Sequence, residues 1–295
     1  MEKIIGIDIG GTTIKADLYD LEGRSLKHYK EVSTSIDYER QSNHILEQVC
    51  CLIEEYNQDN TIYGVGIAKA GVVNSQTGEV VYAGYTIPGY CGTNFKQTIL
   101  ERFQLPVAVE NDVNCAALGE AWLGNARGLS NLVMLTVGTG IGGSVIINNQ
   151  ILNGHQFTAG EVGYLPVKGQ DWQNLASAKA LLELYKEKSG IADPTGPEFF
   201  ADIKADNPIA QETLATFIDH FTEGILTISY LLNPEVIIIG GGIFSESALL
   251  LSKIRASLTQ KVKNARFLPR HIIAASLGNE AGRIGAVKHF LNTHQ

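Results

Sequence analysis

The sequence is poor in cysteine. Its 295 residues include four cysteines, Cys50, Cys51, Cys91 and Cys115, and no two of them have the CxxC spacing of a metal or redox site. The adjacent pair forms no ligand pattern with the other two. We therefore expect free thiols in a reducing compartment instead of a disulfide framework or a cysteine-bound metal.

Long apolar runs and an excess of positive charge are also missing. No apolar run approaches the roughly 20 residues that cross a bilayer, and Met1-Glu2-Lys3 leads straight into Ile4–Ile7, which leaves no room for a signal peptide. The formal net charge of −8 counts against nucleic acid as a main partner. We expect a cytoplasmic protein of about two domains that binds neither nucleic acid nor membrane.

The sequence contains no Gly-Lys pair and therefore no P-loop. Gly138, Gly140 and Gly143 match the GxGxxG pattern of dinucleotide sites, but such a site needs a helix after the turn. Residues 144–147 (SVII) are rich in β-branched side chains and predict a strand, so the dinucleotide interpretation fails. The turn is then either an ordinary hairpin or one whose backbone N–H groups face a phosphate.

Two stretches share one order of features. Residues 4–19 (IIGIDIGGTTIKADLY) predict a buried strand, a glycine turn and an alternating strand. Residues 131–148 (NLVMLTVGTGIGGSVIIN) repeat that order. The repeat indicates an internal duplication with a cleft between the halves.

The rest of the chain alternates between helical and strand periodicity, which predicts an α/β fold. Helices are expected over residues 38–56, 95–103, 176–188, 209–232, 247–258 and 281–291. Further strands are expected over residues 25–32, 62–68, 107–109, 150–152, 235–239 and 271–275. A loop rich in glycine and proline is expected over residues 71–92.

The two matching turns favour a nucleotide site over two ordinary hairpins. Thr12, Thr13 and Thr139 offer N–H and hydroxyl donors to phosphate oxygens. Asp8, on the strand before the first turn, is suited to hold Mg²⁺ through water. A third turn, residues 240–242 (GGG), offers small residues against which a flat ring can lie.

Asp112 stands where a predicted strand, residues 107–109, meets a helical pattern. Its carboxylate can cap the helix by accepting N–H groups of the first turn. It can also act on a ligand, because open α/β sheets bind ligands at the carboxyl ends of their strands. The periodicity leaves both roles open.

Five motifs in this order resemble the ROK family of sugar kinases and repressors over residues 4 to about 287. They are Asp8-Ile9-Gly10-Gly11-Thr12, Glu110-Asn111-Asp112, residues 138–143 (GTGIGG), Gly160-Glu161-Val162-Gly163 and residues 234–242 (PEVIIIGGG). The resemblance implies a duplicated actin/hexokinase-like (ribonuclease H-like) two-domain fold with a central cleft. It places the domains at residues 1–118 and 119–280, with a C-terminal helix, about residues 281–295, that packs back onto the first domain.

The resemblance also implies roles for single residues. The expected nucleotide-binding residues are Asp8, Gly10, Gly11, Thr12, Thr13, Gly138, Thr139, Gly140, Gly241, Gly242 and Gly282, and Asp8 would organise Mg²⁺ through water. The expected sugar-binding residues are Gly71, Asn111, Asp112, Glu161 and Tyr164. Asp112 would be the general base that takes the proton of a sugar hydroxyl during phosphoryl transfer.

The sequence departs from the family after Glu161. Many kinases of this family have a histidine at the position of Tyr164 and then a CxCGxxGCxE zinc loop, but residues 165–180 contain neither Cys nor His. Structural zinc needs four N or S ligands, so we expect none. The loop's glutamate, which closes over the sugar's C1–C2 edge, is missing too; Gln173 or Asn174 lies nearest.

An open anomeric side would suit a β-glucoside. Tyr164, together with residues 87–90 (IPGY), resembles the β-glucoside kinase branch. Tyr90 and Tyr164 could stack on a second ring or be ordinary core or surface aromatics. Lys69 replaces a residue that is commonly small or proline beside the sugar, and we expect it to be solvated.

The leading hypothesis is an ATP-dependent kinase, with Mg²⁺, that phosphorylates the 6-hydroxyl of a glucose-type sugar, such as the β-glucoside cellobiose. A glucokinase or N-acetylmannosamine kinase is the alternative, although both normally carry the zinc loop. A ROK repressor would have a winged helix-turn-helix before the first glycine turn, where this sequence has seven residues. A non-catalytic sugar sensor stays open, and the family suggests a homodimer.

Overall fold

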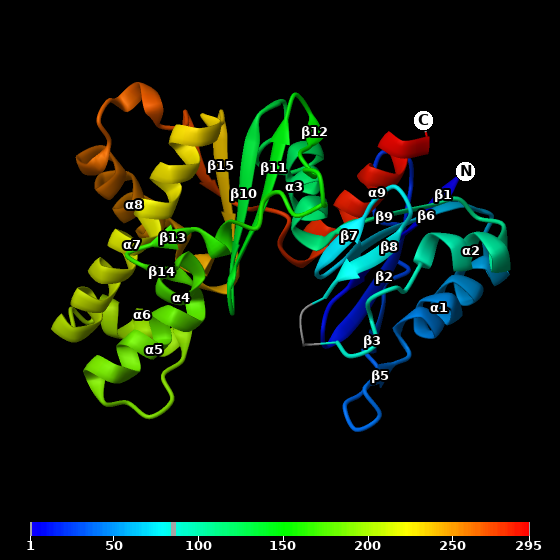
Figure 1. Ribbon diagram of the computed structural model, residues 1–295, viewed down its shortest axis with the longest axis horizontal. Helices are drawn as coiled ribbons and strands as arrows, with labels where there is room; N and C mark the ends of the chain where they lie inside the picture. The colour runs from blue at the N-terminus through cyan, green and yellow to red at the C-terminus, as the bar shows by residue number, and fades with distance from the viewer. Residues whose placement is uncertain (1, 84–86, 295) are drawn as a thin grey trace. The chain divides into compact units, whose positions relative to one another are not determined.

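The computed structural model describes residues 2–83 and 87–294. Its contacts divide the chain into two compact units. The first comprises Met1–Gly128, Asn153–Ala159 and Ser276–Gln295, and the second comprises Leu129–Leu152 and Gly160–Ala275. Met1, residues 84–86 and Gln295 lie outside the described residues. Each unit has a five-stranded sheet covered by helices (Figure 1), so the expected α/β class is confirmed.

The first unit has a mixed sheet of order β3-β2-β1-β6-β9. Its strands are β1 (Lys3–Ile9), β2 (Thr13–Tyr19), β3 (Lys30–Ser33), β6 (Ile62–Lys69) and β9 (Val107–Asn111). Strands β1 and β2 form an antiparallel hairpin, whereas β1, β6 and β9 run parallel. Ile9 pairs with Lys69, which pairs with Asn111. The carboxyl ends of the three parallel strands therefore meet at one edge.

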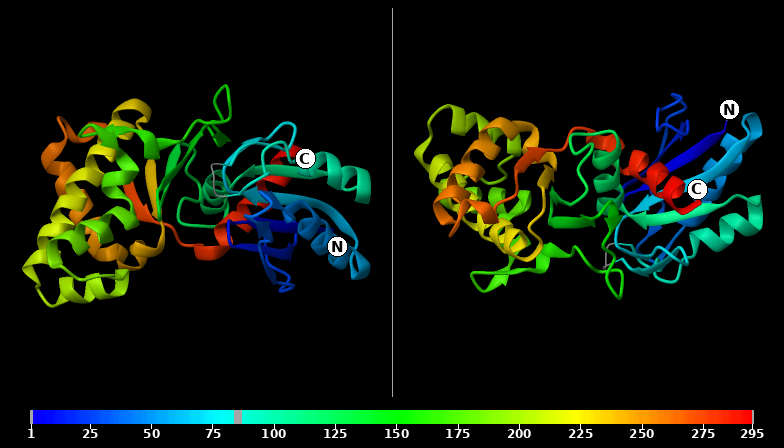
Figure 2. Two further views of the ribbon diagram at one scale, coloured as in Figure 1. Left: turned by 60° about the horizontal axis from the view of Figure 1, so that its bottom comes forward. Right: turned by 90° about the horizontal axis from the view of Figure 1, so that it is seen from above.

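Helices cover both faces of this sheet. Figure 2 shows the C-terminal helix packed along one of these faces. Helices α1 (Ile45–Asp59) and α2 (Phe95–Phe103) pack on the face formed by side chains such as Ile5 and Ile67. Helices α3 (Asp112–Trp122) and α9 (Ala281–His294) pack against each other, and α9 lies on the opposite face over β1 and β6.

Glycines permit the close approach of α9. A Cβ at Gly66 would lie 2.3 Å from the carbonyl oxygen of Ala286, and one at Gly285 would lie 1.6 Å from that of Cys115. Glu120, at the end of α3, is fully buried. It accepts hydrogen bonds from the backbone N–H groups of Asn125 (3.0 Å), Ser276 (2.6 Å) and Leu277 (2.8 Å). This carboxylate thus joins the segment after α3 to the segment that leads into α9.

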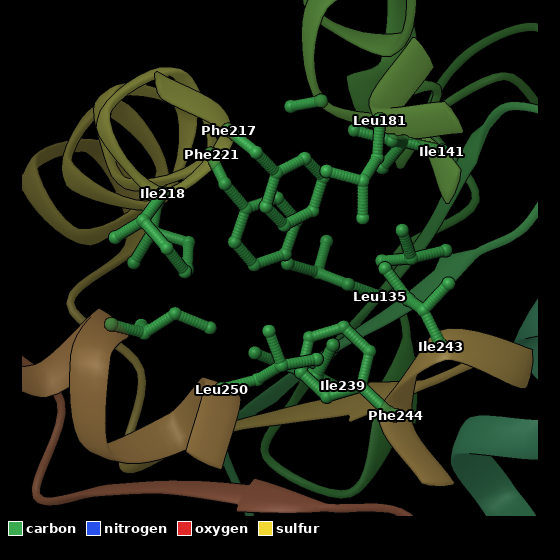
Figure 3. Close-up of a cluster of buried hydrophobic side chains, with 14 of the residues drawn as sticks. Leu135, Ile141, Leu181, Phe217, Ile218, Phe221, Ile239, Ile243, Phe244 and Leu250 are labelled. Carbon is green, nitrogen blue, oxygen red and sulfur yellow. The ribbon is translucent and has the colours of Figure 1, made fainter. Parts of the chain in front are cut away.

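The second unit has a sheet of order β12-β11-β10-β15-β16. Its strands are β10 (Leu132–Val137), β11 (Ile141–Ile147), β12 (Gln150–Ile151), β15 (Val236–Gly240) and β16 (His271–Ala274). Its helices are α4 (Trp172–Ala176), α5 (Ala178–Ser189), α6 (Gly196–Lys204), α7 (Pro208–Leu232) and α8 (Ser247–Lys261). Figure 3 shows the core in which Phe217 and Phe221 of α7 meet Leu135 and Ile239 of the sheet.

The two sheets repeat one topology. In each, an antiparallel hairpin (β1–β2 or β10–β11) begins the sheet, and the first strand of the hairpin pairs in parallel with a later strand (β6 or β15). Asp8 and Thr136 hold the same place, one residue before the last residue of the first strand. The internal duplication predicted from the sequence is confirmed.

Several boundaries differ from the expected ones. Helix α1 begins at Ile45, not at residue 38, because β4 (Ile36–Asp37) pairs with β5 (Ser42–Asn43) before it. The strand expected from residue 25 begins at Lys30, since Ser25 Oγ and the N–H of His28 bond to the buried carboxylate of Asp17.

The expected loop of residues 71–92 holds a short hairpin, β7 (Val72–Asn74) and β8 (Glu79–Tyr82), and its residues 84–86 lie outside the described part. Helix α6, absent from the expected elements, starts with a capping box between Thr195 and Glu198. The remaining short elements are β13 (Pro166–Val167), β14 (Gln170–Asp171) and the 3₁₀ turns η1 (Val162–Tyr164), η2 (Gly242–Glu246), η3 (Ala265–Phe267) and η4 (Gly278–Glu280). No helix in residues 2–83 and 87–294 is long and apolar enough to cross a membrane.

Candidate active site

Asn111 and Asp112 form the junction between β9 and α3. The side chain of Asn111 caps the helix, since its Oδ1 accepts the N–H groups of Val113 (2.9 Å) and Asn114 (3.1 Å). Asp112 is the first helical residue, and its Oδ1 accepts the N–H of Val113 (3.0 Å) and the Nδ2–H of Asn111 (2.9 Å). The cap is therefore Asn111, which leaves the second oxygen of Asp112 for other chemistry.

Glu110 supports this junction and was given no role from the sequence. It is buried, and its Oε1 accepts the N–H of Asn111 (2.7 Å) and the Nδ2–H of Asn114 (3.0 Å). Burial raises the pKa of Glu110, and these hydrogen bonds oppose that rise. An acid inside the otherwise apolar run of residues 107–110 (VAVE) was the available signal for such a buried support.

Asp8 lies near the end of β1, in the same sheet and unit. Burial, and then the negative charge of Asp112, raises the pKa of Asp8 to about 6, while Arg283 and Lys15 lower it. Gly282 of α9 adjoins this carboxylate, because a Cβ added there would lie 3.0 Å from Oδ2 of Asp8. A side chain at residue 282 would therefore press on the carboxylate of Asp8.

The first glycine turn is braced from within and exposed at its tip. The N–H of Gly10 donates to the carbonyl of Thr13 (2.9 Å), and Thr34 donates through Oγ1 to Gly10 (3.0 Å) and through its N–H to Thr12 (2.9 Å). Gly11 and Thr12 stay exposed. This arrangement suits backbone donors that face an anion.

The second and third glycine turns adjoin in the other unit. The N–H of Gly138 donates to the carbonyl of Gly140 (3.0 Å), and Gly138 and Thr139 are exposed. Gly241 has φ +118°, and a Cβ there would lie 2.1 Å from the carbonyl oxygen of Val137, so only glycine fits. Gly242 after it is exposed.

The segment of Glu161 and Tyr164 docks on β11. A Cβ at Gly143 would lie 2.5 Å from the carbonyl oxygen of Gly160, which brings the two backbones together. Glu161 precedes the turn η1, which ends at Tyr164, and both side chains are exposed. Gln173, also in this unit, fits between Gly140 and Gly163. Its Oε1 would lie 2.7 Å from a Cβ at Gly140 and 2.9 Å from one at Gly163.

Each unit thus gathers a share of the expected site residues. The first holds Asp8, Gly10, Gly11, Thr12, Thr13, Gly71, Asn111, Asp112 and Gly282. The second holds Gly138, Thr139, Gly140, Glu161, Tyr164, Gly241 and Gly242. Gly71 joins its group directly, because its carbonyl accepts the Nδ2–H of Asn111 (3.1 Å).

The expectation that Lys69 is solvated was wrong. The side chain is fully buried, since it continues the inward-facing row of Val65 and Ile67 on β6 and then lies over the ring of Tyr90. Tyr90 is buried and packs edge-on against Phe95, as a core aromatic does. The burial of Lys69 was not predictable from periodicity, because lysine at a strand end is usually exposed. A core position was one of the two interpretations of Tyr90.

Cys50 and Cys115 are buried, Cys51 and Cys91 are exposed, and all four are free. In the part of the chain that the structure describes, no three His, Cys, Asp or Glu side chains are grouped so that they could hold a metal ion.

The ROK family model matches residues 4–292. The chain is 37% identical over 288 residues to an uncharacterised protein of Clostridium perfringens, covering 96% of each. It is 33% identical over 307 residues to a β-glucoside kinase of Listeria monocytogenes, covering 99% of this chain and 100% of the relative. A ROK glucokinase from Streptomyces griseus, solved with glucose and AMPPNP, superposes with a TM-score of 0.78 at 28% identity over 97% of this chain and 98% of that one. The chain therefore belongs to the ROK family and has the actin/hexokinase-like two-domain fold of its sugar kinases.

Proposed function

We propose that this ROK sugar kinase transfers the γ-phosphate of ATP to the 6-hydroxyl of a glucose-type sugar, with a β-glucoside such as cellobiose as the preferred acceptor. The observation that carries the proposal is the junction of β9 and α3. There Asn111 caps the helix and orients Asp112, so that one carboxylate oxygen stays available to a substrate hydroxyl.

Asp112 acts as the general base. A sugar hydroxyl is a weak nucleophile, and a carboxylate within hydrogen-bond reach takes its proton as the phosphoryl group arrives. Loss of water around the carboxylate raises the pKa of Asp112, while the N–H of Val113 and the charge of Lys69 lower it. The raised pKa makes the carboxylate a better proton acceptor than a free aspartate.

Glycine turns of both units bind the nucleotide. Backbone and hydroxyl donors of Gly10, Gly11, Thr12, Thr13, Gly138, Thr139 and Gly140 contact the phosphates, and Gly241, Gly242 and Gly282 contact the adenosine. The exposed tips of the first two turns and the absence of side chains in the third support this assignment.

Magnesium fits the donor set beside Asp8. A carboxylate with a pKa of about 6 is ionised at neutral pH, and carboxylate and hydroxyl oxygens, as of Asp8 and of Thr12 and Thr13 in the turn after β1, are the hard oxygens that Mg²⁺ prefers. Asp8 would hold the ion through water, and the ion would supply positive charge against the phosphates of ATP.

Sugar hydroxyls bind to Gly71, Asn111, Glu161 and Tyr164. Asn111 offers an amide donor and a carbonyl acceptor, which a vicinal diol can use together. The segment after Tyr164 lacks the zinc loop of other family members, and the exposed tyrosine can stack on the second ring of a β-glucoside.

A substrate panel tests the proposal. ADP release is measured with Mg-ATP and glucose, N-acetylmannosamine, cellobiose or an aryl β-glucoside, and ³¹P NMR locates the phosphate. We expect kcat/KM to be highest for cellobiose or the aryl glucoside, with the phosphate on O6.

Asp112→Asn should lower kcat by at least about 10²-fold with sugar binding kept, whereas Asp59→Asn, at the exposed end of α1, should not. A preference for free glucose or N-acetylmannosamine would contradict the β-glucoside, and rapid turnover by Asp112→Asn would contradict the base.

A further inference from the structure

Lys69 is a buried cation whose ammonium has no hydrogen-bond partner among the described residues. It is the last residue of β6, is 0% exposed, and Nζ finds no acceptor in the part of the chain that the structure describes. An unpaired charge in a protein interior is strongly destabilising unless other groups compensate it. The groups around Lys69 show how its charge is compensated.

The ammonium lies over an aromatic ring and beside Gly71. Nζ is 4.6 Å from the ring centroid of Tyr90, within the range of a cation–π interaction. It also lies close to Gly71, where an added Cβ would be 3.5 Å from Nζ. The carbonyl of Gly71 accepts the amide of Asn111, which in turn donates to Asp112.

The charges around the junction are unequal. Asp112 and the thiol of Cys91 are the groups whose charges favour the Lys69 cation. Asp8 carries the same sign of charge as Asp112 and so does not attract it, whereas Arg283 of α9 and Lys15 of β2 favour the ionised form of Asp8. Hydrogen bonds and one positive charge oppose protonation of Asp112, and that charge belongs to Lys69.

We propose that Lys69 is a positioning residue for Asp112. The ammonium of Lys69, fixed over Tyr90 beside Gly71, keeps the carboxylate of Asp112 ionised and aimed at the acceptor hydroxyl. The inference rests on the proposed role of Asp112 as general base. Lys69 touches neither reactant; it acts through the carboxylate and through the loop of Gly71.

The arrangement limits the active form at both ends of the pH range. Burial lowers the pKa of Lys69 to about 8, opposed by Asp112, so the ammonium is present at neutral pH and is lost above it. Activity should therefore fall on the alkaline side as Lys69 deprotonates. On the acid side it falls as Asp112 is protonated.

The test compares Lys69→Met with Lys69→Arg. In Lys69→Met we expect kcat at pH 7 to fall about tenfold, the acid limb to move about one pH unit upward and the alkaline fall near pH 8 to disappear. Lys69→Arg keeps the charge to high pH, so it should hold the acid limb in place and also remove the alkaline fall.

The control is Lys30→Met. Lys30 belongs to the same unit and also lies over a tyrosine ring, 4.9 Å from the centroid of Tyr56, but it is paired with Glu55 at the surface. We expect its pH profile to match that of the wild type. Thermal unfolding of each variant identifies any that fails to fold, and Lys69→Arg keeps the test available if Lys69→Met does fail.

A readout without catalysis separates this inference from the proposed function. The carboxyl ¹³C shift of labelled Asp112, assigned with Asp112→Asn, reports its pKa whether or not sugar is phosphorylated. A higher pKa of Asp112 in Lys69→Met supports the inference. An unchanged pKa and an unchanged pH profile overturn it and leave the kinase proposal intact. A wild type that phosphorylates no sugar overturns the kinase proposal and with it the catalytic role of Lys69, even where the pKa of Asp112 still depends on Lys69.

Discussion

Asn111 and Asp112 divide two tasks that one residue type could have performed. The sequence motif did not decide whether the side chain of Asp112 caps α3, because Asn111 and Asp112 can both accept first-turn N–H groups. The structure gives the cap to Asn111. Asp112 then enters the helix at the N-terminal end, where the helix dipole favours a negative charge.

The role proposed for Asp8 predicts that the binding of Mg-ATP weakens in acid. The pKa of Asp8, raised to about 6 by burial and by Asp112, means that the carboxylate gains a proton as the pH falls through 6 and loses its attraction for Mg²⁺. The KM for Mg-ATP should therefore rise several-fold between pH 7 and pH 5.5. Asp8→Asn should raise that KM at every pH and remove the pH dependence; an unchanged dependence in this variant would show that another group titrates.

At the scale of elements, α9 depends on glycine for its place against α3. A Cβ at Gly285 would lie 1.6 Å from the carbonyl oxygen of Cys115, a backbone atom that cannot rotate away. Gly285→Ala should lower the free energy of unfolding by about 1–3 kcal/mol or more, because the two helices must separate. Thermal unfolding followed by circular dichroism measures it.

The matched variant is Gly196→Ala. Gly196 begins α6, and a Cβ there meets nothing within 4 Å. Alanine at that site should leave the melting temperature unchanged or raise it slightly. Equal melting temperatures for Gly285→Ala and the wild type would mean that α3 and α9 tolerate wider spacing.

Sequence periodicity predicted well those elements whose ends are set by their own apolar spacing. Residues 95–103 form α2 with the expected ends, and α7 runs from Pro208 to Leu232 as its pattern requires. Elements defined by polar contacts were missed: the start of α1 depends on the β4–β5 pairing, and α6 on the Thr195–Glu198 capping box.

The same holds for the site. The glycine turns and the Asn-Asp pair were visible as motifs, because their chemistry needs particular residue types. The burial of Lys69 depends on Tyr90, which is distant in sequence, and the support from Glu110 depends on Asn114 in the next helix. Such tertiary pairs leave no periodic signal in one sequence.

At the scale of the whole molecule, the chain passes between the units four times, near residues 128–129, 152–153, 159–160 and 275–276. Glu120 accepts hydrogen bonds from segments beside the first and the last of these passages. Glu120→Gln places an amide N–H₂ among N–H and O–H donors, so at least one bond is lost. We expect a decrease of about 1–3 kcal/mol in the free energy of unfolding of the first unit.

Calorimetry of the full chain measures this, and Glu54→Gln, on the exposed face of α1, serves as its control. Glu120 accepts four hydrogen bonds, from the N–H groups of Asn125, Ser276 and Leu277 and from the hydroxyl of Ser276. If the first unit unfolds at the wild-type temperature in Glu120→Gln, these bonds add nothing net to stability.

The duplicated hairpins are alike in backbone and unlike in charge. Where the first copy has Asp8, the second has the neutral Thr136 at the matching place in β10. Both copies of the turn can present backbone amide groups, which suit phosphate oxygens. Under the proposed function, the first copy alone would add a carboxylate for a cation, and the second would offer only neutral donors.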